Sequence, residues 1–391
     1  MLLRKALLTL AAASSALAVP ILDKRQGPTR GVNLGGWLVL EPWITPSIFQ
    51  KYGGSVVDEY TLCQQDPNAE GVLQSHWSSW VTLGDFQRIA NSGKGINLVR
   101  IPVGYWAFQK YGEDPYVQGA KDYLHQAIGW ASQTGLQVWI DLHGAPYSQN
   151  GFDNSGQRIA NPQFTTADSI PFMASVAGQL AAEFGSNPVV VGIELVNEPL
   201  MAVLPGGRDS ITEYYYQAHG AVRGSYGNAI VISDGFDEPS SWNGILTDTI
   251  VDHHEYQVFD NEDVAMSYQE HVDAAWSRAA TWGSSDRRLI CGEWTAAMTD
   301  CAAALNGYGI GARFDGTYSK PGETSYYVGS CANKNFIDQW DQGLKDATRN
   351  YIQAQINAFE QHANGWIFWN FKTEASAEWD FFRLVDNGVW P

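Results

Sequence analysis

The feature that most constrains the fold is a regular alternation of short apolar runs with longer amphipathic segments. Eight runs are predicted strands: residues 31–34, 98–102, 137–142, 189–195, 229–233, 250–254, 289–293 and 366–369. Several are almost continuously apolar, which is typical of parallel strands buried on both faces. Helix-period segments lie between most of them, at residues 84–92, 120–133, 169–183, 209–224, 264–279 and 339–361. This pattern predicts an α/β protein with a single (β/α)8 barrel, the TIM-barrel fold.

A doubly wound parallel sheet would show the same alternation of strands and helices. Such a sheet often carries a G-x-G-x-x-G motif after its first strand, and the residues after the run 31–34 do not contain one. No linker, repeat or low-complexity tract divides residues 26–391, so we expect a single domain. The long stretches 37–80 and 294–337 are expected to be elaborated loops of the barrel.

The first residues have the organisation of a secretory signal. Arg4 and Lys5 precede an apolar run at residues 6–13, and Ala16-Leu17-Ala18 is a small-residue cleavage site. The apolar run is shorter than the roughly 20 residues that a transmembrane helix needs. A dibasic pair, Lys24-Arg25, follows the cleavage site. We therefore predict a signal peptide at 1–18, a propeptide at 19–25 and a secreted mature domain at 26–391, located outside the cell or in its wall.

The charge balance excludes some partners. The chain has 24 Lys and Arg against 42 Asp and Glu, a formal net charge of −18, and such a surface repels nucleic-acid phosphates. With 45% hydrophobic and 17% charged residues, the composition is that of a globular protein rather than a disordered one. We expect a monomer without nucleic-acid or membrane partners.

The four cysteines, Cys63, Cys291, Cys301 and Cys331, all lie in the predicted mature domain. An even number in a secreted chain suggests two disulfides, which allows three pairings. Cys301 and Cys331 flank a loop-like stretch rich in Gly, Tyr and Asn, so we favour a bridge between them. Cys63 and Cys291 then either pair or remain buried thiols.

Candidate functional residues occur where the predicted strands end, because the carboxyl ends of barrel strands form the active-site face. These positions hold Arg100, His143, Asn197, Glu198, His254, Tyr256, Glu293 and Trp369. Two carboxylates across one barrel mouth are what retaining glycoside hydrolysis requires. One protonates the leaving oxygen and the other attacks the anomeric carbon, at a separation of about 5–5.5 Å. The 16 Trp, 18 Tyr and 16 Phe also suit a sugar ligand, whose C–H faces pack on aromatic rings.

The remaining strand-end residues have roles that fit such a pair. Arg100 can hold a nucleophilic carboxylate ionised, and Tyr256 can donate a hydrogen bond to it. Asn197 can donate to the sugar 2-hydroxyl, and Trp369 can form the floor under the sugar ring. Strand alternation puts residues 254 and 256 on one face and His253 on the other, so we predict that His253 is structural.

Asn197 and Glu198 are adjacent, so both can face the mouth only if the strand ends or bulges there. No HExxH or similar spacing supports a metal site. We expect neither a metal nor a cofactor.

Several motifs resemble glycoside hydrolase family 5, and in particular its fungal secreted exo-β-1,3-glucanases. They are Gly31-Val-Asn-Leu-Gly-Gly-Trp37, Val99-Arg-Ile-Pro-Val-Gly-Tyr105, Asp141-Leu-His-Gly-Ala-Pro146, Gln149-Asn-Gly-Phe-Asp-Asn154, Asn197-Glu-Pro199, His254-Glu-Tyr-Gln-Val-Phe259, Gly292-Glu-Trp-Thr-Ala-Ala297 and Gly365-Trp-Ile-Phe-Trp-Asn-Phe-Lys-Thr-Glu374. The match spans nearly the whole mature chain. One departure is Trp43 in Glu41-Pro-Trp43, where the family usually has Tyr.

The resemblance implies roles for individual residues. Glu198 would be the acid/base and Glu293 the nucleophile, with the other strand-end residues around the first sugar. Phe152 and Phe259 would clamp the glucose on the leaving side, and Glu41 and Asp153 would also bind substrate. For this chemistry Glu198 must keep its proton well above the ordinary Glu pKa of about 4.3, and Glu293 must stay ionised.

The expected activity is retaining hydrolysis of β-1,3-glucan from its non-reducing end, with transfer to a second sugar as a side reaction. One alternative is another β-glucanase of the family, either a β-1,6-glucanase or an endo-acting enzyme. A more distant alternative is a non-catalytic protein that binds wall glucan. That alternative predicts the loss of one catalytic carboxylate, and both Glu198 and Glu293 are present.

Overall fold

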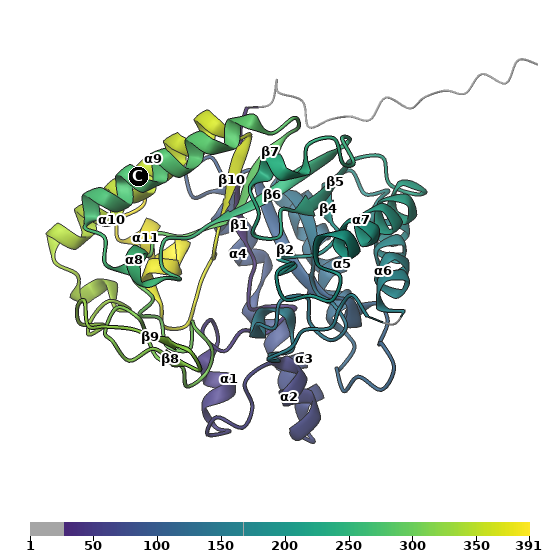
Figure 1. Ribbon diagram of the computed structural model, residues 1–391, viewed down its shortest axis with the longest axis horizontal. Coiled ribbons are helices and arrows are strands. Elements are labelled where there is room, and N and C mark those ends of the chain that lie inside the picture. The colour runs from purple at the N-terminus through teal and green to yellow at the C-terminus, as the bar shows by residue number, and fades with distance from the viewer. Residues whose placement is uncertain (1–26, 167) are drawn as a thin grey trace, which may run out of the picture.

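The computed structural model describes residues 27–166 and 168–391 (Figure 1). The barrel strands are β1 (Thr29–Asn33), β2 (Leu98–Gly104), β3 (Gln137–Gly144), β4 (Val190–Glu194), β5 (Ala229–Ser233), β6 (Thr249–Glu255), β7 (Leu289–Trp294) and β10 (Gly365–Phe368). They close in the order β1-β10-β7-β6-β5-β4-β3-β2, and each neighbouring pair is parallel. The (β/α)8 barrel is therefore confirmed. The predicted signal peptide and propeptide lie outside the described residues.

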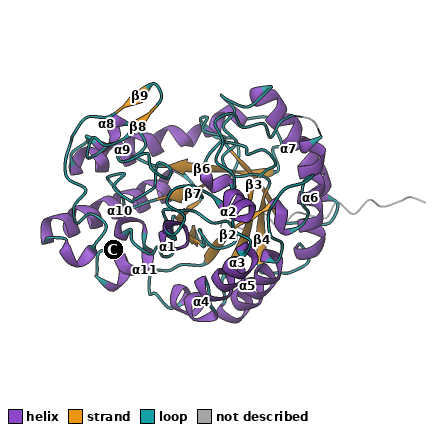
Figure 2. Cartoon of the chain, turned by 90° about the horizontal axis from the view of Figure 1, so that it is seen from below, coloured by secondary structure: helices purple, strands orange, loops and turns teal. Residues whose placement is uncertain are grey.

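Helices surround the barrel, as Figure 2 shows for the view from below. The longer ones are α4 (Leu83–Ala90), α5 (Ala120–Thr134), α6 (Ser169–Phe184), α7 (Gly207–Arg223), α9 (Tyr268–Ala279) and α10 (Gln342–His362). Each overlaps one of the six predicted helices. The predicted helix at 264–279 begins later than expected, because Ser267 forms a capping box with Glu270 and starts α9 after the short α8 (Asn261–Val264). A last helix, α11 (Phe381–Asp386), follows the barrel.

The stretch 37–80 differs from its prediction as a loop, since it folds into helices α1 (Pro46–Gln50), α2 (Glu59–Gln65) and α3 (Ala69–Trp80). A capping box between Asp58 and Thr61 starts α2. The stretch 294–337 is mostly loop, apart from a hairpin of β8 (Ser319–Lys320) and β9 (Glu323–Thr324). Both stretches lie at the same end of the barrel (Figure 1).

The barrel interior is built in layers, because alternate residues of each strand point inward. One cluster in the barrel is apolar and contains Leu98, Trp139, Val191, Ala229, Val231, Ile250, Ile290 and Ile367. Four charged residues are fully buried and in contact with one another, and they are Arg100, Asp141, Glu194 and Asp252. We call these four residues the charged layer. The predicted catalytic residues lie directly beyond it.

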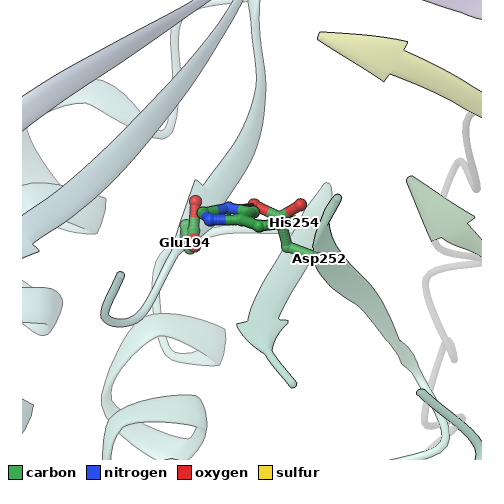
Figure 3. A group of neighbouring side chains, drawn as sticks. All are labelled: Glu194, Asp252 and His254. Carbon is green, nitrogen blue, oxygen red and sulfur yellow. Dashed lines mark hydrogen bonds and ion pairs between the residues drawn. The ribbon is translucent and has the colours of Figure 1, made fainter. Parts of the chain in front are cut away.

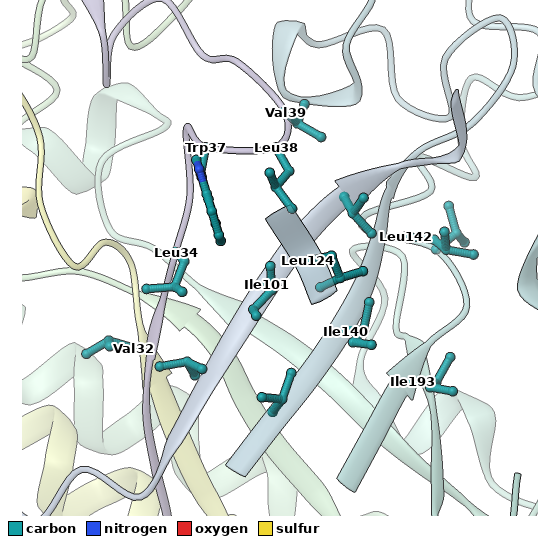
Figure 4. Packing of buried hydrophobic residues seen from close by; sticks show 14 of the residues in the cluster. Val32, Leu34, Trp37, Leu38, Val39, Ile101, Leu124, Ile140, Leu142 and Ile193 are labelled. Atoms are coloured by element: carbon teal, nitrogen blue, oxygen red, sulfur yellow. The ribbon is translucent and has the colours of Figure 1, made fainter. Parts of the chain in front are cut away.

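The outward-facing residues of the strands form the main hydrophobic core with the helices. Figure 4 shows part of it around β2 and β3, where Ile101, Ile140 and Leu142 pack with Leu124 of α5. Trp37 also belongs to this core, and its Nε1 donates to the Trp77 carbonyl of α3 at 2.9 Å. This contact joins the two ends of the first insertion, residues 37–80. No helix within the described ranges has the length and apolarity needed to cross a membrane.

A disulfide joins Cys301 to Cys331, as the sequence predicts. Cys63 and Cys291, which the structure also describes, carry free thiols, so a second bridge between them is excluded. The bridged segment is further held at Asp300, whose carboxylate accepts from the backbone N–H groups of Arg313 (2.6 Å) and Phe314 (2.9 Å). These contacts give the loop 301–331 a defined shape at the barrel mouth.

We expect the double variant Cys301→Ser/Cys331→Ser to lose about 3–4 kcal/mol of unfolding free energy, because the bridge closes a loop of this length in the unfolded chain. The sequence separation is 30 residues. Denaturant unfolding of the oxidised proteins measures the loss. Cys63→Ser is the control, since it removes an unbridged thiol. Equal losses in the two variants would mean that the bridge itself contributes nothing.

Candidate active site

A cavity of about 390 Å³ opens at the carboxyl ends of the barrel strands. The residues that line it include Glu198, Glu293, Tyr256 and Trp369 from the strand ends. The two insertions form part of its wall, with Glu41 and Trp43 from the first and Leu305, Asn306, Gly307, Arg313, Tyr318, Lys320 and Glu323 from the loop 301–331. The barrel floor and the insertions therefore enclose one pocket around the predicted catalytic pair.

Glu293, at the end of β7, is held by two donors. Arg100 Nη1 donates to its Oε1 at 2.8 Å, and the Tyr256 hydroxyl donates to its Oε2 at 2.8 Å. Burial raises the pKa of Glu293 above its ordinary value, against the opposing charges of His254 and Arg100. Because both oxygens accept from fixed donors, the carboxylate is oriented as a nucleophile must be.

Glu198 faces the same cavity because β4 has already ended at Glu194. Its backbone has a φ of +45°, a left-handed conformation that redirects the chain. This brings adjacent Asn197 and Glu198 both to the mouth and confirms that the strand ends before them. Asn154 Nδ2 donates to Glu198 Oε2 at 3.0 Å, and His254 Nδ1 lies 2.8 Å from Oε1. One carboxylate oxygen of Glu198 and one of Glu293 lie within 4.8 Å of each other.

The pKa of Glu198 differs from the expectation. Burial alone would raise its pKa, but the hydrogen bond and the positive charge of His254 outweigh burial and lower it. Burial opposes a charge on His254 as well, yet Glu293 and Asp252 raise the pKa of this imidazole well above its ordinary value. The expectation of a raised Glu198 pKa is therefore wrong, since the neighbouring His254 lowers it.

The other predicted strand-end residues gather around this pair. Asn197 Oδ1 accepts from Arg100 Nη2 at 2.9 Å, which leaves its amide nitrogen directed at Glu198 Oε2, 3.5 Å away. His143 stacks on Trp369, with ring centroids 5.6 Å apart and planes 8° from parallel. The structure thus brings Arg100, His143, Asn197, His254, Tyr256 and Trp369 to one place with both carboxylates.

His253 has the structural position predicted for it. Its Nδ1 hydrogen-bonds to the carboxylate of Asp234, and its ring packs against Trp282. Burial opposes its ionisation, but the Asp234 charge raises the pKa of His253 to about 10. A register shift of β6 against β7 falls between His253 and His254.

Aromatic side chains form the rim of the cavity. Phe152 and Phe259 are both partly exposed, at 39% and 43%, and both line the cavity. Phe152 contacts Phe236 edge-on at 6.4 Å, whereas Phe259 packs against Tyr256 and Trp379. Strand-end reasoning missed Phe236, although it follows β5 closely enough for the same rule to have found it.

Glu41 and Asp153, which the resemblance places at the substrate, are also at the cavity. Trp43, which stands where the family usually has Tyr, donates from its Nε1 to Glu41 Oε2 at 2.8 Å. This hydrogen bond orients the Glu41 carboxylate. Burial, with a contribution from Asp153, raises the pKa of Glu41 well above its ordinary range. Burial and the Asp58 charge raise the pKa of Asp153 to about 7. In its protonated form, each of these two carboxyl groups can donate a hydrogen bond to a sugar hydroxyl as well as accept one from it.

The charged layer beneath the pair was not predicted. Arg100 Nη2 lies 2.8 Å from Glu194, 3.2 Å from Asp141 and 3.7 Å from Asp252, and Arg100 Nη1 bonds Glu293 above. Glu194, Asp252 and His254 also have ligand atoms close enough to hold a metal ion (Figure 3). In this structure the Arg100 guanidinium already provides the positive charge among these carboxylates.

Comparisons with known proteins identify relatives of this chain. The family model for Cellulase (glycosyl hydrolase family 5) matches residues 65–310. The glucan 1,3-beta-glucosidase of Lachancea kluyveri is 43% identical over 387 residues, which cover 93% of this chain and 86% of that protein. The probable glucan 1,3-beta-glucosidase A of Aspergillus niger is 44% identical over 409 residues, covering 99% and 95%.

Among solved structures, the rutinosidase from Aspergillus niger superposes with a TM-score of 0.74 at 20% identity, covering 95% of this chain and 100% of that chain. At this identity the likeness concerns the fold alone. The family match, which spans more than half of the sequence, and the relatives at 43–44% identity go further. The chain is a glycoside hydrolase that belongs to glycosyl hydrolase family 5.

Proposed function

We propose that this protein is a retaining exo-β-1,3-glucosidase that releases glucose from the non-reducing ends of β-1,3-glucan. The observation that carries the proposal is the pair Glu198 and Glu293, with oxygens within 4.8 Å of each other at the base of one cavity. Retaining enzymes need closely spaced carboxyl groups, because the nucleophile must reach the anomeric carbon directly. The substrate follows from the relatives named glucan 1,3-beta-glucosidase.

In the first step, Glu293 attacks the anomeric carbon while Glu198 protonates the departing glycosidic oxygen. The proton is available across the 2.8 Å contact between His254 and Glu198. In the second step, Glu198 takes a proton from a water molecule, which then releases glucose from Glu293. A second sugar can replace this water, and the product is then a longer oligosaccharide.

Exo action is supported by the walls of the cavity. The insertion that carries Glu41 and the loop 301–331 both line it, so a chain end fits the site better than the middle of a long glucan. Phe152 and Phe259 at the rim offer apolar faces to the sugar on the leaving side. Exposed aromatic faces at such a rim are suited to hold the glucose that departs.

We further propose that the protein is secreted after removal of residues 1–18, processed after Arg25, and active as a monomer. The apolar run 6–13 supports secretion, and the Lys24-Arg25 pair supports processing after Arg25. N-terminal sequencing of the extracellular protein, together with its mass in solution, tests these statements.

Incubation with laminarin, pustulan and carboxymethylcellulose tests the activity, with product size and anomeric form followed by NMR. We expect laminarin to release glucose alone, initially as the β-anomer. A ladder of oligosaccharides from laminarin would indicate endo action, and a preference for pustulan would indicate a β-1,6-glucanase. Initial α-anomer would contradict retention, and binding without hydrolysis would support the non-catalytic alternative.

A further inference from the structure

Both ring nitrogens of His254 face carboxylates. Its Nδ1 lies 2.8 Å from Glu198 Oε1 and 3.5 Å from Glu293 Oε2, and its Nε2 lies 3.2 Å from Asp252 Oδ2. An imidazole nitrogen without a proton would present a lone pair to a carboxylate. The ring therefore needs a proton on each nitrogen, unless one of the carboxyl groups carries the proton instead. Asp252 accepts the hydrogen bond from Nε2, the ring nitrogen that does not face Glu198.

Asp252 is fully buried and fits closely into the barrel interior. A Cβ atom at Gly292 of β7 would lie only 2.0 Å from Asp252 Oδ1, so the carboxylate occupies the space that a side chain at position 292 would take. Asp252 Oδ1 has no hydrogen-bond partner within the part of the chain that the structure describes. Packing thus places this carboxylate against His254, although its second oxygen gains no bond there.

The charged surroundings are shared by the strands on every side of His254. Several elements contribute ionisable groups near His254. Strands β2, β3, β4 and β7 contribute Arg100, Asp141, His143, Glu194 and Glu293. The segments after β4 and β5 contribute Glu198 and Asp234, and β6 with the residue that follows it contributes Asp252, His253 and Tyr256. Figure 3 shows His254 together with Asp252 and Glu194. Arg100 pairs with Glu194 and Asp141 at 2.8 and 3.2 Å but lies 3.7 Å from Asp252. Asp252 is thus the carboxylate of the charged layer that contacts the imidazole.

We propose that Asp252 is a positioning residue that fixes a proton on His254 Nε2 and thereby keeps a second, transferable proton between His254 Nδ1 and Glu198 Oε1. This inference rests on the proposed function and adds a residue that acts through His254. In the free enzyme the transferable proton lies on Nδ1 of an imidazolium. When substrate binds, it passes to Glu198 and then to the glycosidic oxygen as the bond to the anomeric carbon breaks. The water of the second step returns one proton to the pair, so protons balance over the cycle.

Without the negative charge of Asp252, the pair formed by His254 and Glu198 should release its transferable proton at lower pH. In Asp252→Asn, the amide can donate to Nε2 and thereby favours the neutral ring with its proton on Nδ1. We expect the basic limb of the kcat/KM profile for laminarin to move down by about one to three pH units, the range typical of an opposite charge at this distance. An aryl glucoside with a good leaving group should show a smaller shift, because its departure needs no acid.

Asp234→Asn is the matched control. It makes the same substitution in the other Asp–His pair, where Asp234 bonds His253 behind the mouth. Loss of stability is expected in both variants, but the basic limb should move much further in Asp252→Asn, because Asp252 contacts His254 directly and Asp234 acts on it through charge alone. An unshifted profile in Asp252→Asn, or the same shift in Asp234→Asn, would overturn the proposal.

A second measurement does not depend on the folding of Asp252→Asn. The nitrogen-15 NMR spectrum of the wild-type imidazoles, with His254 assigned by His254→Gln, should show both ring nitrogens protonated at pH 6. A neutral His254 ring at that pH would overturn the proposal even if Asp252→Asn does not fold. If the wild type hydrolyses none of the glucans, the proposed function fails instead, and the NMR result still reports on the Asp252–His254 contact.

Discussion

Glu293→Gln is expected to reduce the laminarin kcat/KM by about four orders of magnitude or more, because the amide cannot form the covalent glycosyl-enzyme. The substitution keeps the size of the side chain, and its carbonyl oxygen can still accept from Arg100 or Tyr256, which hold the wild-type carboxylate at 2.8 Å. The loss therefore reports chemistry rather than a rearranged site. Initial rates on laminarin, with glucose quantified, give the ratio.

The control for this variant is Glu360→Gln. Glu360 lies on α10 and pairs with Arg30 at 2.7 Å, next to the residue where β1 begins, so it is at the opposite end of the barrel from the cavity. Near wild-type activity is expected for it. If Glu293→Gln also hydrolysed laminarin at close to the wild-type rate, Glu293 would not be the nucleophile.

Glu198→Ala should have an effect that depends on the leaving group. For laminarin we expect kcat/KM to fall by about three to four orders of magnitude, the upper part of the range for general acid–base catalysis. For an aryl glucoside whose phenol leaves without a proton, the loss in kcat/KM should be much smaller, since only the first step determines this quantity. The two substrates act as controls for each other on one protein preparation.

The second step offers an independent measurement on the same variant. Water attacks the glycosyl-enzyme slowly without a base, whereas azide needs none, so added azide should accelerate turnover of the aryl glucoside by Glu198→Ala and yield β-glucosyl azide. Equal losses on both substrates, with no effect of azide, would contradict the acid/base role of Glu198.

Most of the barrel could be predicted because its strands are short apolar runs, a local property of the sequence. Each predicted run overlaps a strand, and only the ends differ, as in β4, which ends at Glu194. The helices of the first insertion could not be predicted in this way. Helix α2, for example, depends on Glu59, whose carboxylate accepts from the Leu40 backbone at 2.9 Å and from Trp106 Nε1 at 2.9 Å. These partners are distant in sequence, so no local pattern reveals them.

The candidate site shows the same division. Strand ends and motif spacing predicted the residues that meet at the mouth, because the fold brings strand ends together. They did not predict Arg313 and Tyr318, which reach the cavity on the loop 301–331. They also did not predict the lowered pKa of Glu198, since it depends on a 2.8 Å approach of His254 from another strand. Distances between side chains on different strands thus decide the direction of this pKa shift.

The contact between Gly292 and Asp252 restricts how this sequence can evolve. Any side chain at position 292 would collide with the Asp252 carboxylate, at 2.0 Å for a Cβ alone. Exchange of Gly292 is therefore tolerated only together with a smaller residue at position 252, and the reverse change frees space that a larger residue 292 can fill. In a mutational library selected for folded protein, these two positions should be accepted or rejected as a unit, although neither residue lines the cavity.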